Sequence, residues 1–488
     1  MTNGKTKLRF LAVVMTLCMA LTLLPVSSSA AGQAVTYSQV DNSVLSAEVT
    51  QGNGSFLGEE DAPPEDETVR AVIFLKDASL VDSGYSTMGL ADNAAAMAYS
   101  DKLVNTQDSV IRRIETNVLK GEALDVIYQF TIGVNAVAVS VPYGKLDEIA
   151  KVQGVDKVLL DTLYELPQEP ADPDTGTSGE MVQSYSTWAD GYTGAGSRIA
   201  IIDTGIDRDH PSFSEEGFYY GLATSAARQG KSIADYDLLT LEDVEALLPR
   251  LHVNPEDNPE KFSAADLYTN AKIPFGFNYM AETADYNCDA ISGDHGCHVA
   301  GIAAANTYVL HLDADGDPYY APQDQGATGV APNAQVLVMK VFSDGWGAFE
   351  ADYMAALEDA ILLGCDSVNL SLGSAAAGRS FSSTYGVLLN SLLETDTVMT
   401  NSAGNNGSWA DNEVNGIGLT RTEYIRTNTG GSPGSYRQSF AIASADNIAI
   451  TGIVGNYNGY IAAVTDTGDT YGAAPFQTLD TSGDGSGT

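Results

Sequence analysis

The sequence predicts an α/β protein with a doubly wound, mostly parallel β-sheet, preceded by a small α+β unit. Two observations lead to this fold class. Over residues 185–445, apolar runs that suit buried strands alternate with helical stretches, which is typical of a parallel sheet covered on both faces. Over residues 68–166, the expected elements follow in the order β-α-β-β-α-β, which builds a small sheet with its helices on one face.

The elements of the small unit follow from its hydrophobic pattern. Its first run, T-V-R-A-V-I-F-L-K, is rich in β-branched and apolar residues, as strands are. The expected elements are a strand at 68–76, a helix at 94–119, two strands within 126–141 on either side of Gly133, a short helix at 145–151 and a strand at 155–160. This order predicts a ferredoxin-like sheet.

The large unit repeats strand and helix patterns over a longer stretch. Strands are expected at 198–202, 335–342, 367–372 and 398–402, and helices at 295–306, 351–363 and 388–394. The stretch 212–285 interrupts this alternation with sequence rich in Asp, Glu and Pro. We expect it to be an insertion at the rim of the sheet.

The segments outside these units have compositions of their own. Residues 1–30 combine three basic residues, an apolar run and a small-residue end, which is typical of a secretory signal peptide rather than of a membrane anchor. Residues 31–67 suit a flexible acidic leader, and residues 167–184 suit an exposed linker rich in Pro and Asp. Residues 446–488 hold short β-like runs among Gly, Thr and Asp. We expect no membrane-spanning segment once the signal peptide is cleaved.

The charge balance excludes some partners. With 24 basic and 64 acidic residues the formal net charge is −40, so nucleic acid and anionic lipid surfaces would repel the chain. The charge suits the solubility of an extracellular protein; carboxylates also bind calcium, although the pattern assigns no calcium site. Cys288, Cys297 and Cys365 remain after the signal peptide, and this odd number makes no complete disulfide framework.

Three segments of the large unit place an Asp, a His and an Asn at an expected strand end, helix start and turn, where folds of this class hold their functional groups. The buried strand I-A-I-I-D ends on Asp203, and open α/β sheets bind ligands at the carboxyl ends of their strands. H-G-C-H-V-A-G begins with His295, and its small residues allow a helix to start close to the sheet. S-A-G-N-N-G follows an expected strand and contains Asn405, whose amide can donate hydrogen bonds to a developing oxyanion.

Together these motifs resemble those of subtilisin-like serine proteases. The matching motifs, in the family's order, are D-T-G-I-D at 203–207, H-G-C-H-V-A-G at 295–301, G-V-A-P-N-A at 329–334, N-L-S-L-G at 369–373 and S-A-G-N-N-G at 402–407. The resemblance covers about residues 185–445. It implies a serine endopeptidase, secreted or on the cell surface of a Gram-positive bacterium, that hydrolyses proteins or peptides through an Asp-His-Ser triad without a cofactor.

The resemblance also implies roles for individual residues. Asp203 would orient and stabilise the imidazole, and His295 would be the general base and acid. Asn405 would be a donor of the oxyanion hole.

Further parts of the chain resemble parts of the same family. Ser371, Leu372 and Gly373 resemble the strand that lines the first specificity pocket and pairs with the substrate backbone. Residues 68–166 resemble the inhibitory propeptide, which would bind the catalytic domain of its own chain. Residues 446–488 look like the start of a protease-associated domain inserted into large cell-envelope members.

Two features depart from the family's pattern. Cys297 stands where the family usually has Thr, and its similar volume should preserve the packing. The nucleophile motif, Gly-Thr-Ser followed by Met-Ala-Pro, does not occur after Asn405, and the letters G-T-S at 176–178 lie in the linker. We therefore expect the catalytic domain to be incomplete, its Ser to lie beyond Thr488, and this chain alone to be inactive.

Two functions of other classes compete with this interpretation. The chain could be an inactive secreted protein that holds peptides in the same cleft, or a metalloprotein built around His295, Cys297 and His298. The zinc hypothesis lacks a second ligand pair at the usual spacing, so we expect no metal site and a structural, hydrogen-bonded His298.

Two further features have simple structural interpretations. The D-A-D-G-D run at 313–317 lacks the downstream Glu of a calcium loop and is expected to be a solvated turn. Cys365 is expected to be a small core residue.

Overall fold

A computed structural model describes most of both expected units. The described residues are 63–161, 163–164, 178–253, 261–288, 293–313, 316–322, 328–342, 347–373, 384–392, 395–404, 433–434, 436, 439–443, 453–457 and 460–464. The predicted signal peptide, nearly all of the leader and most of the linker lie outside these residues.

The N-terminal unit (residues 63–164) has the predicted β-α-β-β-α-β order. Its elements are β1 (Thr68–Leu75), α3 (Ala94–Asn117), β2 (Asp125–Phe130), β3 (Ala136–Pro142), α4 (Leu146–Ile149) and β4 (Val155–Leu160). The sheet order is β2-β3-β1-β4 with antiparallel neighbours. The side chain of Asn93 accepts hydrogen bonds from the N–H groups of Ala95 and Ala96, which explains why α3 begins at this point.

Successive residues of β1 point to opposite faces of the small sheet. Ile73 packs in one core with Val110 of α3 and Ile149 of α4. Val72 belongs instead to the core that contains α11 (Glu350–Leu362) of the large unit. The small sheet therefore has helices of its own on one face and uses the other face for a contact with α11.

The large unit (residues 178–443) is built on a six-stranded parallel sheet in the order β14-β13-β12-β6-β10-β7. Its strands are β6 (Arg198–Asp203), β7 (Phe275–Asn278), β10 (Gln335–Lys340), β12 (Ser367–Leu370), β13 (Val398–Ser402) and β14 (Phe440–Ile442). The first strand, β6, lies inside the sheet, and later strands extend it on both sides. This is the doubly wound α/β arrangement that the sequence predicts.

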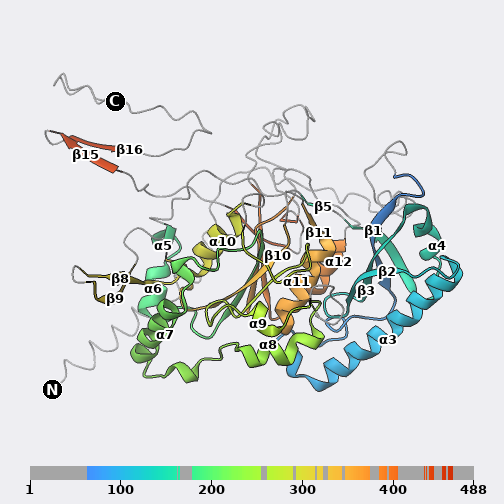
Figure 1. The fold of residues 1–488 in the computed structure, drawn as a ribbon, viewed down its shortest axis with the longest axis horizontal. Helices are drawn as coiled ribbons and strands as arrows, with labels where there is room; N and C mark the ends of the chain where they lie inside the picture. Colours follow the sequence, from blue (N-terminus) through green and yellow to red (C-terminus); the bar gives the residue numbers. More distant parts are fainter. Residues whose placement is uncertain are drawn as a thin grey trace, which may run out of the picture. The chain divides into compact units, whose positions relative to one another are not determined.

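Helices cover both faces of this sheet. Ile201 of β6 packs with α10 (His295–Ala304), whereas Ala200 and Ile202 belong to the core that contains α11. α11 contacts β6 and β10 as well as β2 of the N-terminal unit (Figure 1). All of its residues are buried. A strand covered on both faces needs an unbroken apolar sequence, which is what β6 has from Ile199 to Ile202.

Residues 212–285 differ from the expected rim insertion. They contain α7 (Glu215–Gln229), α8 (Leu241–Leu247), α9 (Ala264–Leu267) and β7, a fully buried edge strand that pairs in parallel with β10. Their acidic residues serve helix starts, since Asp243 and Asp266 complete capping boxes with Thr240 and Ser263. The acidic composition therefore gave no indication of β7, a four-residue strand that is stabilised by pairing with the distant β10.

The remaining described elements are short. They are α5 (Ser178–Met181), α6 (Ser184–Ala189), α12 (Thr384–Leu392), the pair β5 (Leu163–Tyr164) and β11 (Ala348–Phe349), the hairpin β8 (Tyr308–Leu312) and β9 (Pro318–Pro322), the hairpin β15 (Ile453–Tyr457) and β16 (Tyr460–Val464), and the 3-10 turns Leu90–Asp92, Tyr143–Lys145, Pro211–Phe213, Ile233–Asp235 and Leu248–Arg250. The further domain expected over residues 446–488 stays a prediction. Within the described ranges, no helix has both the length and the apolar character needed to cross a bilayer.

Candidate active site

Asp203 is the last residue of β6, inside the six-stranded sheet. Lys340 of β10 lies opposite Asp203 in the register, and Leu370 of β12 lies opposite the preceding Ile202. The strand thus brings the carboxylate to the carboxyl edge of the sheet, where the sequence predicted it. Only 1% of the Asp203 side chain is exposed, so the charged group requires partners.

His295 is the first residue of α10, and it contacts Asp203 directly. Its Nδ1 lies 2.8 Å from Asp203 Oδ1, and the same oxygen accepts a hydrogen bond from the N–H of Thr204 at 2.7 Å. Because an ionised carboxylate only accepts, Nδ1 carries the proton and Nε2 carries the lone pair. Asp203 therefore fixes the ring in the tautomer that can take a proton through Nε2, as the base of a triad does.

Small residues let α10 approach β6 closely enough for this contact. The N–H of Gly296 donates to Thr204 Oγ1 at 2.8 Å. A Cβ at Gly296 would lie 2.3 Å from the carbonyl oxygen of Gly205 and 3.1 Å from Asp203 Cβ. Gly205 itself has a φ of +102°, a conformation that side chains disfavour. The glycines of D-T-G and H-G thus have a steric role in placing His295.

Gly296→Ala is expected to destabilise the protein by roughly 1–3 kcal/mol, because the new methyl group must displace backbone at Gly205. Gly301→Ala in the same helix is the matched control. A Cβ there meets nothing within 4 Å, and Ala favours a helix over Gly by about 1 kcal/mol. Urea unfolding of both variants is the measurement. Equal stability changes would contradict the steric role of Gly296.

The predicted substrate-binding residues follow β12 at the same edge of the sheet. Ser371 Oγ accepts a hydrogen bond from Asn369 Nδ2 at 3.0 Å, and the carbonyl of Leu372 accepts one from Ser402 Oγ at 3.2 Å. Leu372 is buried, and Gly373 is partly exposed. Their role as a specificity pocket stays a prediction. Asn405 lies outside the described residues, so its predicted oxyanion role has no geometry here.

The two thiols near His295 have environments that suppress their reactivity. Burial, helped by the neighbouring Cys297, raises the pKa of Cys288 to about 11, and burial also raises the pKa of Cys297. A thiol with a raised pKa is a poor nucleophile. Cys297 packs against the core between β6 and α10, as expected if Cys replaces Thr without disturbing the packing.

His298 only partly matches its expected structural role. Burial and the neighbouring His295 lower its pKa. Its Nε2 is buried and has no hydrogen-bond partner among the described residues, so the expected side-chain hydrogen bond is not seen at that atom.

The other two structural expectations fit the described residues. Cys365 is a buried core residue, and burial raises its pKa. Asp313 Oδ1 accepts a hydrogen bond from the N–H of Asp317 at 2.8 Å in the turn between β8 and β9, and both residues are exposed.

Two positioning residues were not singled out from the sequence. Thr204 is fully buried and connects β6 to the start of α10 through its Oγ1. Lys340 is also buried, and its Nζ donates to the carbonyl of Asn287 at 2.7 Å. A lysine that ends the apolar strand Q-V-L-V-M-K was the available signal, since lysine is almost never buried without a partner.

Comparison with known proteins identifies the family of this chain. A family model described as the subtilase family (Peptidase_S8) matches residues 194–483, more than half of the chain. The PIII-type proteinase of Lactococcus lactis subsp. cremoris (strain SK11) is 25% identical over 394 residues, which cover 78% of this chain and 17% of that protein. The minor extracellular protease Vpr of Bacillus subtilis (strain 168) is 23% identical over 317 residues, which cover 63% of this chain and 29% of that protein.

Among solved structures, fervidolysin from Fervidobacterium pennivorans, a keratinolytic enzyme related to subtilisin, has a TM-score of 0.39 and 14% identity over 82% of this chain and 45% of that chain. The chain spans less than a third of the length of the two proteases named above. With the family match over residues 194–483 and the ordered motifs it contains, the chain belongs to the subtilase family of serine proteases.

Proposed function

We propose that this chain is part of the precursor of a secreted subtilisin-like serine endopeptidase. In this proposal Asp203 and His295 are two members of an Asp-His-Ser triad, and the serine lies beyond Thr488, because the nucleophile motif does not occur after Asn405. The reaction is peptide hydrolysis through an acyl-enzyme and needs no cofactor. The substrates are proteins or peptides.

The observation that carries the proposal is the 2.8 Å contact between His295 Nδ1 and Asp203 Oδ1. Both residues lie in the family's motifs, and the contact leaves Nε2 as the proton acceptor. The contact alone does not separate catalysis from metal binding, because a carboxylate also orients histidines that bind metals through the other nitrogen. Catalysis is favoured because both residues lie within the ordered motifs of the family. A protein that only holds peptides would have no need of a buried Asp-His pair.

The N-terminal unit is proposed to be the inhibitory propeptide. Its support is the polar contact with α11. Arg70 of β1 donates to Asp352 of α11 at 2.7 Å and to Asp161 at 2.9 Å, and Asp161 accepts from the N–H of Ala351 at 3.0 Å. Buried charge pairs of this kind fix one relative orientation of two surfaces. Residues 167–184 would then be the cleavable linker.

Secretion is proposed from the features of residues 1–30. Export to the outside of a bacterial cell agrees with the printed name of the extracellular protease Vpr. A Gram-positive source, with the protein free or held at the cell surface, completes this proposal.

Serine-directed labelling tests the proposed function. A fluorophosphonate probe is expected to label a longer product of the same gene once its N-terminal unit has been cleaved off, and to leave residues 1–488 unlabelled. Adding residues 63–166 in trans should slow the labelling of the processed product. A covalent label on residues 1–488 would show that the nucleophile lies within them. Undiminished labelling with micromolar residues 63–166 would remove the propeptide role.

A further inference from the structure

Lys340 carries a buried ammonium group at the same edge of the sheet as Asp203. The two residues lie opposite each other in the register of β10 and β6, and residues paired in this way across parallel strands point to the same face of the sheet. That face is covered by α10, since Ile201 and Val338, two positions earlier in the two strands, belong to the core that contains α10. Only 2% of Lys340 is exposed, and a buried lysine needs acceptors.

The Lys340 side chain holds a segment that pairs with the chain after β6. Its Nζ donates to the carbonyl oxygen of Asn287 at 2.7 Å, and Asn287 forms a parallel bridge with Ile206. The N–H of Ile206 donates to the carbonyl of Tyr286 at 3.2 Å, and its carbonyl accepts from the N–H of Cys288 at 3.1 Å. Lys340 therefore supports the residues against which the turn after β6 is placed.

This turn contacts both the supporting segment and the start of α10. A Cβ at Gly205 would lie 2.4 Å from the carbonyl oxygen of Tyr286, so these two backbones touch. The carbonyl oxygen of Gly205 in turn lies 2.3 Å from the position of a Cβ at Gly296. A displacement of residues 286–288 would therefore act through Gly205 on the helix start that carries His295.

Asp203 is held by the backbone of the same strand. The carbonyl of Asp203 accepts a hydrogen bond from the N–H of Val341 at 3.0 Å, just after β10. The Lys340 side chain, one residue earlier, holds the segment that supports the start of α10. The end of β10 thus contacts the supports of both members of the Asp203–His295 pair.

We propose that Lys340 is a positioning residue that keeps His295 within hydrogen-bond distance of Asp203. It does not act as a catalytic residue, because its Nζ donates to the backbone of Asn287. The inference rests on the proposed function only in giving the pair a catalytic role. The positioning itself concerns the 2.8 Å contact between the two side chains.

The expected effect follows from the chemistry of the Lys340 contact. Met is unbranched and fills nearly the same space as the aliphatic part of Lys, but it has no donor. In Lys340→Met the carbonyl of Asn287 would lose a hydrogen bond from a charged group, which is a strong one. A misplacement of about 1 Å at a catalytic group can cost on the order of 10²-fold in rate.

Lys272 provides a matched control at the opposite end of β10. It is fully buried, and its Nζ donates to the carbonyls of Pro332 at 2.9 Å and Ala334 at 2.6 Å, just before β10 begins. Lys272→Met removes the same kind of hydrogen bond as Lys340→Met, but at the edge of the sheet away from Asp203. It is expected to lower stability and to leave the Asp203 contact intact.

Proton NMR of residues 1–488 with isotopically labelled histidine rings tests the positioning directly. A proton on Nδ1 of His295 that is held against a carboxylate is expected to resonate far downfield, and the signal is assigned by its loss in His295→Gln. Lys340→Met should remove this signal or speed its exchange with water on the order of tenfold. Lys272→Met should retain it.

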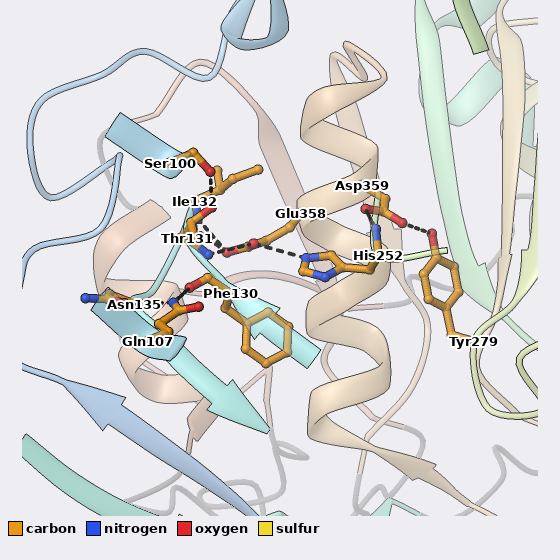
Figure 2. A network of polar contacts seen from close by, with 11 residues as sticks. Ser100, Gln107, Phe130, Thr131, Ile132, Asn135, His252, Tyr279, Glu358 and Asp359 are labelled. Carbon is orange, nitrogen blue, oxygen red and sulfur yellow. Dashed lines mark hydrogen bonds and ion pairs between the residues drawn. The ribbon is translucent and has the colours of Figure 1, made fainter. Parts of the chain in front are cut away.

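His252 supplies an internal reference in the same spectra. Its Nε2 lies 3.2 Å from Glu358 Oε2, in a network with α11 that is separate from the Lys340 contact (Figure 2). Any signal from this ring is assigned by its loss in His252→Gln, and Lys340→Met should leave it unchanged.

Kinetics on a gene product that extends past Thr488 and carries the nucleophile provide a second readout. Lys340→Met is expected to lower kcat on the order of 10²-fold with little change in KM, because a misplaced His295 affects the chemical step and not substrate binding. Circular dichroism checks that each variant is folded. If a Met variant does not fold, Lys340→Gln and Lys272→Gln replace the pair, since the shorter Gln side chain cannot place its donor at the same distance.

A folded Lys340→Met or Lys340→Gln with the wild-type His295 signal overturns the inference. Loss of that signal in folded Lys272→Met or Lys272→Gln overturns it as well, and so does a raised KM at unchanged kcat in Lys340→Met. A retained signal together with an active longer product would reject this inference alone. Loss of the signal in Lys340→Met, with a longer product that a fluorophosphonate does not label, would reject only the proposed function.

Discussion

Replacing His295 by Ala is expected to lower kcat about 10⁶-fold in a gene product that extends past Thr488 and carries the nucleophile. This magnitude was established on subtilisin itself, a member of the same family. In the proposed triad, the physical reason is the contact with Asp203, which leaves Nε2 of His295 as the atom that would take the serine proton. Without it, the serine hydroxyl stays protonated and only binding and oxyanion stabilisation remain.

Asp203→Asn is expected to lower kcat about 10⁴-fold for a different reason. An Asn amide at this position donates to Nδ1, so the proton moves to Nε2 and the ring becomes the wrong tautomer. His298→Gln is the control, because His298 lies in the same helix but takes no part in the Asp203 contact. Initial rates on casein and on a chromogenic peptide are the measurement. Activity within tenfold of the wild type in His295→Ala would remove the triad assignment.

Glu358→Ala is expected to lower the free energy of unfolding of residues 1–488 by about 3–5 kcal/mol, because it removes one partner of a buried charged network. The N–H groups of Thr131, Ile132 and Gly133 would lose their acceptor, and a buried unsatisfied group costs about 1–3 kcal/mol. His252 would lose the same partner.

Glu148→Ala is the control for this loss. Its ion pair with Lys145 is half exposed, so its removal should cost less than about 1 kcal/mol. Urea unfolding followed by fluorescence and by far-UV circular dichroism gives both values, and agreement of the two probes checks that one transition is measured. A loss below about 1 kcal/mol in Glu358→Ala would mean that the turn at 131–133 finds other partners or water.

Long patterned segments could be predicted from the sequence because their signals are local. The helix expected at 94–119 forms at 94–117, and the strands expected at 155–160 and 398–402 have those bounds in the structure. The strand β7 was missed, because its four residues have no periodicity of their own and are stabilised by pairing with β10. Its acidic surroundings pointed to a loop although they hold helix caps.

The candidate site, like the fold, could be predicted only in part from the sequence. Asp203 and His295 could be named from motifs, because a strand end and a helix start are local features and the ordered set resembles one family. Their 2.8 Å contact required the tertiary structure, since 92 residues separate them and only the packing of α10 on β6 brings them together. The close approach at Gly296 is likewise a property of two distant backbones.

The sequence by itself determined the fold class, the two units and the identities of the two residues in contact at the candidate site. Only the tertiary structure decided what the acidic residues of α11 do. In the sequence, Asp352, Glu358 and Asp359 are indistinguishable from the solvated charges of a surface helix. In the structure all three are buried. Asp352 and Glu358 are held by the N-terminal unit, and Asp359 is held by His252 and Tyr279 of the large unit. A buried carboxylate must find a cation or hydrogen-bond donors. Which donors these are depends on chain segments more than a hundred residues away, such as Arg70 and the turn at 131–133.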